Sequence, residues 1–277
     1  MYHPTIWKLD AAAAEFHAMG MLQMKNAAFL LAGQLQQHLV KHSPFRTPRR
    51  FLHAQWCWAL GHIGLLYQVI RWFKKNEPQT ELVLEASGAN NPYFLQALAP
   101  YLTIYNQLPT GMVQEAVMQA VYFGCPDGVQ SLVNFYKSVE RDCADVHLLE
   151  LNEEQHEEIA LLRERLGIAG KRYVALQARA HSHDQARNVS EAQIEEALEP
   201  FLARGFSVVS TGIDPHPINA RFPSVMNLPD PRKASFLLSA ACDQFVGSNS
   251  GAWTIAHAYQ RPVVIMNDYE RSAWIYQ

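Results

Sequence analysis

The first forty residues place apolar side chains at the three- and four-residue intervals of an amphipathic helix. From Asp10 to His42 this spacing predicts two helices that are broken near Lys25. The segment 43–50 contains two prolines and three arginines, and it predicts a linker because proline cannot continue a helix. We expect residues 1–50 to form a helical segment that covers the first sheet with its apolar face. A helical repeat and a dimer contact are the alternatives.

Beyond residue 50, short apolar runs that fit strands alternate with segments of helical spacing. Runs of this length between glycine-containing or polar breaks are typical of buried strands. The alternation predicts parallel sheets with helices on their faces, which is the organisation of α/β proteins. In the first part we expect strands at residues 51–58, 81–85 and 102–105, and helices at 65–75, 92–98, 112–122 and 129–139.

The second half of the chain repeats this alternation. The helix predicted at residues 190–203 has Ser190 at its start and Gln193 three residues later, which is the pattern of a capping box. We therefore expect two Rossmann-like domains, one at residues 51–150 and one at residues 151–277. In the second half we expect strands at 173–177, 206–210, 224–228, 244–247 and 262–266, and other helices at 153–166, 232–241 and up to Tyr259.

Composition and charge narrow the class of protein further. The net charge of −3 and the pI near 6.5 give no overall field that favours DNA or an anionic membrane. The four cysteines form no C-x-x-C pair, so we expect buried free thiols in a reducing compartment. We see no signal peptide and no apolar run of the ~18 residues that a membrane span needs. A cytoplasmic protein is therefore expected.

The turn Ser248-Asn249-Ser250-Gly251 joins a predicted strand to a predicted helix and is rich in hydroxyl groups. The first turn of a helix leaves backbone N–H groups unpaired at the positive end of the helix dipole. Serine and glycine allow an anion to approach these groups, so the turn is a candidate site for phosphate or carboxylate. The alternative is that one of its polar side chains only caps the helix.

The sequence around this turn resembles the donor-binding part of glycosyltransferases of the GT-B fold. The resemblance rests on Phe245–Gly251, the helical segment Thr254–Ala258 and the following Arg261–Val264, which reproduce a pattern of heptosyltransferases. The chain is similar, more narrowly, to a poorly characterised bacterial group of GT-B glycosyltransferases. That group has an arginine after the first strand of the second domain and an Arg-Asn pair before the next helix. The resemblance covers residues 173–268 well and residues 51–105 in outline.

The resemblance implies that the second domain binds a nucleotide-sugar donor, with the donor phosphates at the turn described above. The arginine and the Arg-Asn pair of the family match Arg179 and Arg187-Asn188. Arg179 follows a parallel strand, at the edge where such sheets bind ligands, and a guanidinium can bind two phosphate oxygens at once. The alternatives are a surface ion pair for Arg179 and a helix-capping role for Arg187. Gly212 follows another strand of this sheet and is a further candidate for the donor site. Asn267 follows the last strand and is a candidate for the cleft, in contact with the nucleotide or the acceptor.

In the first domain, Gly61-His62-Ile63-Gly64 is predicted to be a glycine turn between a strand and a helix. It lacks the full G-x-G-x-x-G fingerprint, and Glu85 is the only candidate for an acidic ribose ligand, so evidence for NAD is weak. By the resemblance, this loop faces the acceptor, and Gly61 and Gly64 are candidates for the cleft. His62 is then a candidate general base, since imidazole has the right pKa range. The alternative is a loop histidine with a local hydrogen bond.

The function that these features imply is transfer of a sugar from a nucleotide sugar to a glycan, lipid or protein acceptor. Neither a metal nor a cofactor is expected. The sequence has no D-x-D motif, and a metal site at His181, His183 and Asp184 would need a further ligand from elsewhere in the chain. A sugar-nucleotide epimerase of the same fold, an NAD-dependent Rossmann enzyme and a non-catalytic binding protein are the alternatives. GT-B chains commonly end with helices that return to the first domain, so the sequence is expected to lack these last elements.

Overall fold

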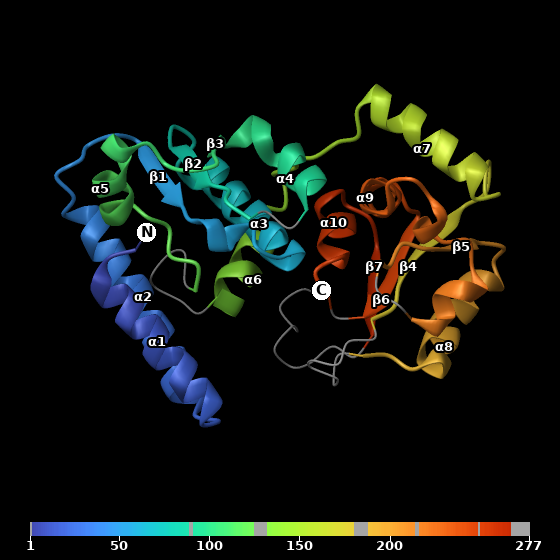
Figure 1. Cartoon of the computed structure of the whole chain (residues 1–277), viewed down its shortest axis with the longest axis horizontal. Helices are drawn as coiled ribbons and strands as arrows, with labels where there is room; N and C mark the ends of the chain where they lie inside the picture. The colour runs from blue at the N-terminus through green and yellow to red at the C-terminus, as the bar shows by residue number, and fades with distance from the viewer. Residues whose placement is uncertain are drawn as a thin grey trace. The chain divides into compact units, whose positions relative to one another are not determined.

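The computed structural model describes residues 2–88, 91–124, 132–179, 188–213, 216–248 and 250–266 of the 277-residue chain (Figure 1). Its residues form two compact units. Asn91–Phe94 and the described residues from Leu148 onward belong to the second unit, and the other described residues up to His147 belong to the first. Each unit contains a parallel sheet with helices, so the predicted α/β fold class with two Rossmann-like units is confirmed.

The first unit contains a three-stranded parallel sheet in the order β1-β2-β3. A parallel bridge between Phe51 and Ala120 continues the sheet on the other side of β1. The helix α5 packs on the sheet through Ala116, which joins a core with Phe51 and Val83. The elements of this sheet and its helices are β1 (Arg49–Leu52), η1 (Ala54–Trp56), α3 (Leu60–Asn76), β2 (Glu81–Glu85), α4 (Pro92–Leu98), η2 (Ala99–Tyr101), β3 (Thr103–Tyr105), α5 (Thr110–Met118) and α6 (Leu132–Asp142).

Two predictions about the start of this sheet are wrong. The strand expected at residues 51–58 ends at Leu52 and is followed by the 3-10 turn η1. The glycine turn expected at residues 61–64 is the first turn of α3, which begins at Leu60. The buried Ile63 extends the apolar spacing of α3 toward its N-terminus, so packing outweighs the low helix propensity of glycine.

The N-terminal residues form a helical hairpin of α1 (Pro4–Ala18) and α2 (Leu22–Lys41). The break lies at Met19–Met21 and not near Lys25 as predicted, because Gly20 adopts a positive φ of 71° after α1. Tyr2, which lies before α1, is buried. Its hydroxyl donates a hydrogen bond to Val121 O and accepts one from Phe123 N. The start of the chain is therefore anchored beside the segment that follows the Ala120 bridge.

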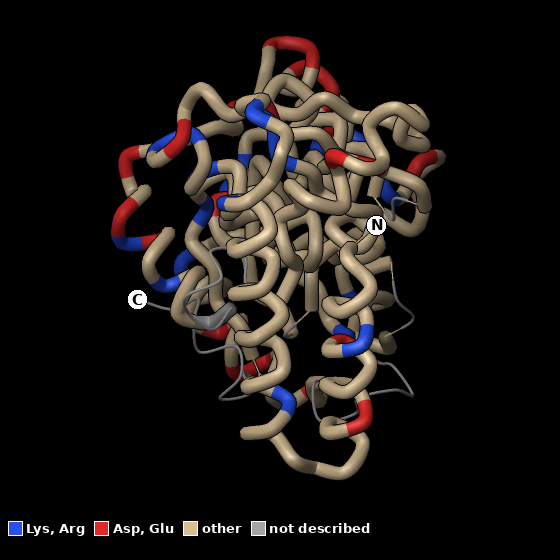
Figure 2. Tube along the Cα trace, turned by 90° about the vertical axis from the view of Figure 1, so that its left-hand side faces the viewer, with Lys and Arg blue, Asp and Glu red and all other residues tan. Residues whose placement is uncertain are grey.

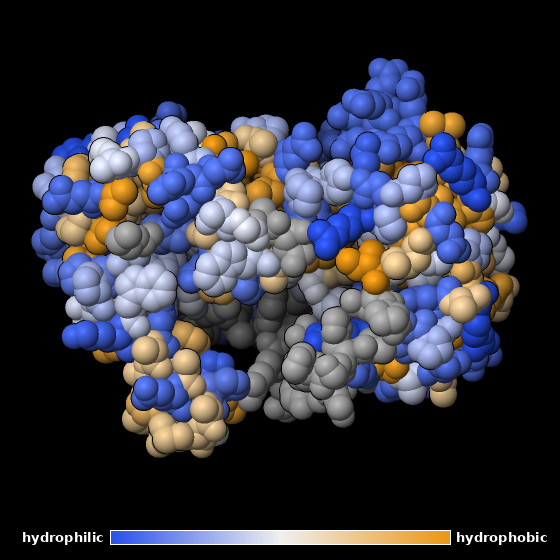
Figure 3. Space-filling model, in the orientation of Figure 1, coloured by the Kyte–Doolittle hydropathy of each residue, from blue (hydrophilic) through white to orange (hydrophobic). Residues whose placement is uncertain are grey.

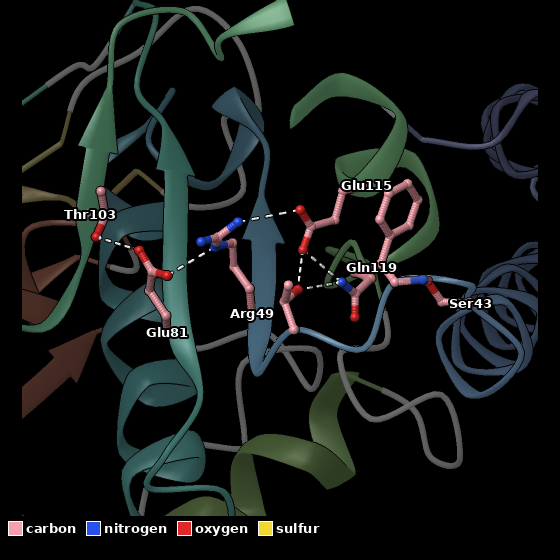
Figure 4. A network of polar contacts seen from close by, with 8 residues as sticks. Ser43, Arg49, Glu81, Thr103, Glu115 and Gln119 are labelled. Atoms are coloured by element: carbon pink, nitrogen blue, oxygen red, sulfur yellow. Dashed lines mark hydrogen bonds and ion pairs between the residues drawn. The ribbon is translucent and has the colours of Figure 1, made fainter. Parts of the chain in front are cut away.

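Polar side chains join the amino-terminal edge of the first sheet (Figure 4). Arg49, at the start of β1, donates to Glu81 of β2 at 2.9 Å and to Glu115 of α5 at 3.3 Å. Glu81 also accepts a hydrogen bond from Thr103 of β3, and the Arg49 guanidinium lowers the pKa of Glu81. Gln119 completes the network by donating to Glu115. The network lies at the edge opposite the strands' carboxyl ends, so its role is to hold the three strands and α5 together.

The second unit contains a four-stranded parallel sheet in the order β5-β4-β6-β7. The helix α8 packs on one face, and α9 and α10 pack together on the other (Figure 1). The predicted capping box is confirmed, because Ser190 Oγ accepts from Gln193 N and the Gln193 side chain accepts from Ser190 N. The elements are α7 (Glu153–Arg165), β4 (Tyr173–Gln177), α8 (Glu191–Leu202), β5 (Ser207–Ser210), η4 (Pro217–Arg221), η5 (Val225–Asn227), α9 (Pro231–Ala240), β6 (Gln244–Ser248), α10 (Trp253–Ala258) and β7 (Val263–Met266).

Two further expectations concern residues 224–228 and the cysteines. The segment 224–228 is not a strand: it contains η5 and makes only an isolated bridge between Ser224 and Ser210.

Cysteine thiols at three described positions are buried and unpaired, as predicted, whereas Cys125 lies outside the described residues. The three described free cysteines are Cys57, Cys143 and Cys242.

No helix in the described ranges is long and apolar enough to cross a membrane.

Candidate functional site

The strand order of the second unit reverses between β4 and β6. From β4 the chain passes to β5 on one side, and it then returns to β6 on the other side of β4. Parallel sheets of this kind bind ligands outside the carboxyl ends of the strands at such a switch point. Arg179 follows β4 by two residues, and the turn at residues 248–251 follows β6. The structure thus places both predicted features after the two strands that flank the switch point.

Gln177, the last residue of β4, ties the two strand ends together. Its side-chain oxygen accepts a hydrogen bond from Ser250 Oγ at 2.6 Å and lies 3.5 Å from Ser248 Oγ. Both Gln177 and Ser248 are buried, at 5% and 0% exposure. The hydroxyl of Ser248 therefore faces the protein, and its predicted contribution to phosphate binding is through the backbone. Sequence reasoning missed Gln177, whose signal is a polar residue at the end of the apolar strand Tyr173–Leu176.

Two glycines lie at the same edge, and they differ in how closely the chain packs on them. A Cβ atom on Gly247 would lie 3.0 Å from the Gln177 backbone oxygen and 2.7 Å from the Phe245 ring. No side chain fits there without a shift, so Gly247 allows the turn to begin against β4. At Gly212 a Cβ atom would meet its neighbours at 3.6 Å or more, which is ordinary contact. The predicted role of Gly212 in donor binding therefore rests on its place after β5.

The groups after β5 are also polar and internally bonded. Ser210 Oγ donates to the Asn219 side-chain oxygen at 2.6 Å, and Thr211 Oγ donates to Leu176 O at 3.2 Å. The side chain of Ser235 donates in turn to Thr211 O. Among the described residues that directly follow β4, β5 and β6, the side chains are neutral except for the partly buried Arg179. This edge carries positive charge and hydrogen-bonding groups without a described carboxylate, which suits an anionic ligand.

No serine side chain caps the N-terminus of α10 in the described part of the turn after β6. The helix begins at Trp253, its N-cap residue is Ala252, and no N-cap side chain bonds to its first turn. Ser250 Oγ instead accepts from Ala252 N at 3.4 Å, inside the turn. Trp253 is 5% exposed and packs edge-on against His257, so it is a core residue and not an open stacking surface.

Several predicted residues lie outside the part of the chain that the structure describes. These include Arg187 and Asn249 of the expected donor site and the cleft candidate Asn267. The segment 181–184, which holds the H-x-H-D sequence, also lies outside the described residues. Asn188 is described and half-buried, two residues before the cap of α8. Within the described ranges, no group of three or more His, Cys, Asp or Glu side chains is arranged to hold a metal ion.

His62 lies in the first turn of α3 and not in a loop. Its Nδ1 atom is 2.8 Å from Gln55 O, and its ring packs edge-on against Phe123 at 4.7 Å. Burial lowers the pKa of His62, while the Gln55 carbonyl opposes this shift. Gly61 and Gly64 belong to the same helix, where Gly64 is buried. The predicted local hydrogen bond is therefore present, and the role of His62 as a base stays a prediction.

The pKa of His62 leads to a testable dependence of stability on pH. The folded protein favours the neutral form of His62, because burial lowers the pKa of this side chain. Neutral His62 therefore contributes its full stability above the ordinary histidine pKa of about 6.5, and this contribution is lost as the pH falls below that value. We expect the free energy of unfolding to fall less between pH 7.5 and 5.5 in His62→Asn, which keeps a donor for Gln55, than in the wild type. Urea titrations at both pH values measure this difference, with the exposed His17→Asn as control. Equal pH dependence in His62→Asn and wild type would refute the assignment.

The carboxyl edge of the first sheet contains a second imidazole that the sequence did not single out. His53 directly follows β1 and is 6% exposed, and its Nδ1 atom lies 3.9 Å from a carboxylate oxygen of Glu85, the last residue of β2. The Tyr2 ring packs edge-on against His53 at 4.6 Å. A histidine beside a carboxylate at this edge is an arrangement suited to proton transfer. Its signal in the sequence is a polar residue directly after an apolar strand.

Comparisons with known proteins identify structural neighbours but no family. No protein-family model matches the chain, and no curated protein matches its sequence. The solved structures that match include several bacterial heptosyltransferases. They include the Escherichia coli ADP-heptose LPS heptosyltransferase II (13% identity, TM-score 0.49, 78% of this chain and 84% of that one) and the iron-containing dodecameric glycosyltransferase TibC from enterotoxigenic E. coli (15%, 0.47, 82% and 61%). The E. coli heptosyltransferase WaaC is 10% identical, with a TM-score of 0.40 over 81% of this chain and 91% of that one. These values are too low to transfer the role of any residue.

Proposed function

We propose that this protein is a glycosyltransferase that moves a sugar from a nucleotide-sugar donor to a hydroxyl group of an acceptor, without a metal or a cofactor. The observation that carries the proposal is the convergence at the switch point of the second sheet. There, Arg179 follows β4 and the Ser-Gly turn follows β6, and Gln177 bonds to the turn. We place the reaction in the cytoplasm of a bacterium.

The chemistry of the leaving group explains why these residues suit the reaction. Breaking the bond between the sugar and the nucleoside diphosphate leaves negative charge on a phosphate oxygen. A guanidinium at Arg179 and backbone N–H groups near Ser250 and Gly251 stabilise that charge. Gln177 holds the Ser250 hydroxyl, which fixes the backbone of the turn. We include Arg187, Asn188, Gly212 and Asn249 in the proposed donor site, together with Ser248, and we place Asn267 in the cleft beside it.

An acceptor hydroxyl must lose its proton during the transfer, and two imidazoles of the first unit are candidates for the base. His62 is the sequence-based candidate, and Gly61 and Gly64 flank it in α3. His53, beside Glu85, is the candidate that the structure adds. The variants His53→Gln and His62→Gln separate the two, because only the variant of the base lowers kcat while donor affinity is kept.

The first test is a thermal-shift panel with UDP-, GDP-, CMP- and ADP-sugars, NAD and divalent cations. A ligand that binds only the folded state at 100 times its Kd adds about 2.7 kcal/mol of stability. We expect Tm to rise with one class of nucleotide sugar and not with NAD. The donor so identified is then incubated with candidate acceptors, and the sugar-bearing product is measured by mass spectrometry. A rise in Tm with NAD alone contradicts the proposal, and donor binding without acceptor-dependent product favours an epimerase or a non-catalytic binding protein.

A further inference from the structure

The N-terminal hairpin carries an unusual share of the exposed apolar surface. Six of the twelve large hydrophobic residues that are exposed in the described ranges lie between residues 7 and 31. The most exposed is Met19 at 61%, and Leu31 and Trp7 are about half exposed, at 53% and 50%. The other three are Met21, Leu22 and Met24, at 39–46% exposure. We call this set of six side chains the hairpin patch.

The core of the hairpin inside its own unit is formed by other side chains, and of the patch residues Trp7 lies beside the Tyr2 ring at 6.2 Å. Ile6 and Ala32 form the inner faces of α1 and α2 and join the core cluster that contains Tyr2. The outer face of α1 continues from Trp7 to the exposed Ala11 and Ala14, which are four and seven residues further on, one helical face. The outer face of α2 runs likewise from Met24 through Ala27 to Leu31. Each helix therefore presents a second apolar face outward.

Charge is nearly absent from the same region. The hairpin contains three lysines and two acidic residues over residues 4–41, and Lys25 is the only charged residue between residues 16 and 40. Figure 2 shows few charged positions along the two helices, and Figure 3 shows apolar side chains gathered at the end of the hairpin. A solvent-facing helix ordinarily carries charged residues on its outer face. The composition of this surface thus indicates that another molecule covers it.

We propose that the hairpin patch is the contact between two copies of this chain, in which the two hairpins pack into a four-helix bundle. Interfaces between identical subunits are enriched in methionine and aromatic residues and depleted of lysine and glutamate at their core, as this surface is. Half-exposed side chains of roughly 200 Å² each give on the order of 600 Å² of apolar surface per copy, close to the ~800 Å² of a stable interface. Packing hairpin against hairpin is a standard route to a four-helix bundle.

The charge pattern favours a second copy over a membrane surface. Helices that lie on membranes have a polar face rich in lysine and arginine, which binds anionic lipid. This hairpin has a formal charge of +1, from three lysines and two acidic residues, and no arginine. Its outer faces also carry small residues, such as Ala11 and Ala27, that allow helices to approach closely. These features suit close packing of helices.

The test is the mass of the 277-residue protein in solution, measured by sedimentation equilibrium between 1 and 100 μM. We expect the wild type to weigh about 63 kDa, twice the 31.4 kDa of one chain. Leu31→Glu places a charge in the patch and should raise the dissociation constant of the dimer at least about tenfold. Leu161→Glu on α7 is the matched control, because Leu161 is 55% exposed and Leu31 is 53% exposed. We expect the control to remain dimeric.

Circular dichroism and Tm of each variant show that it is folded, and Met24→Lys gives an independent disruption of the patch. A monomeric wild type at 100 μM overturns the proposal, as does a dimer that both Leu31→Glu and Met24→Lys leave intact. Flotation with vesicles of phosphatidylglycerol and phosphatidylethanolamine tests the membrane alternative. A monomeric protein that floats with these vesicles, and loses this binding in Leu31→Glu, would assign the patch to a lipid surface instead.

Discussion

Arg179→Ala is expected to weaken binding of the nucleotide-sugar donor by roughly 10- to 150-fold, with little change in the stability of the protein. Hydrogen bonds to charged groups contribute about 1.5–3 kcal/mol each, and this range converts to that loss of affinity. The same loss should appear with the nucleoside diphosphate alone, because the proposed contact is to phosphate and not to the sugar. Isothermal titration calorimetry with both ligands measures it.

Arg172 provides a matched control for this experiment. It directly precedes β4, whereas Arg179 follows the same strand, so the two arginines lie at opposite edges of the sheet. Arg172 is exposed and stacks on the Phe206 ring at 4.1 Å. We expect Arg172→Ala to bind the donor as the wild type does. Equal affinity of Arg179→Ala and wild type for the diphosphate would remove the switch-point edge from the proposed donor site.

Arg71→Ala is expected to lower the free energy of unfolding of the first unit by about 3–5 kcal/mol and its Tm by roughly 10 °C. Arg71 is 4% exposed, and its guanidinium donates to the backbone oxygens of Cys143 and Val146 at 2.6 and 3.1 Å. It also donates to the side chains of Gln68 and Glu140, each at 2.8 Å. Alanine would leave several buried acceptors without a donor, which costs far more than the loss of one exposed ion pair.

Arg141 is the control for this second experiment, since it lies on α6 in the same unit and its side chain is 75% exposed. Its ion pair with the neighbouring Asp142 is solvated, so Arg141→Ala should change the stability by less than about 0.5 kcal/mol. Urea unfolding followed by tryptophan fluorescence compares the variants. A loss below about 1 kcal/mol in Arg71→Ala would mean that water replaces the guanidinium at these carbonyls.

In the second unit, β4 and α8 form where the sequence predicts them because local signals and packing agree there. Tyr173–Gln177 is an uninterrupted buried strand, and the Ser190 capping box starts α8 where it was predicted. The turn after β6 is also readable from the sequence, because small hydroxyl residues between a strand and a helix predict a turn. Patterns of this kind depend on neighbours within a few residues, so a single sequence is enough to read them.

The error at residues 51–58 and the two missed polar residues arise where distant contacts decide the structure. The apolar run that begins at Phe51 looked like a long strand, but Trp56 turns away in η1 and donates to Val121 O, which is 65 residues further on. Gln177 and His53 were missed because each is an isolated polar residue whose partners come from another strand. Their roles become visible only when the order and register of the strands are known.

The burial of Tyr2 has a consequence for how the first unit forms during synthesis. Its hydroxyl bonds to the backbone of Val121 and Phe123, so Tyr2 finds these partners only after about 120 later residues have left the ribosome. Contacts so far apart in the sequence are slow to form, because closing a long loop costs entropy before any contact repays it. Until then the inner face of the α1–α2 hairpin stays uncovered on the nascent chain, where apolar surface is most open to chaperones and to aggregation.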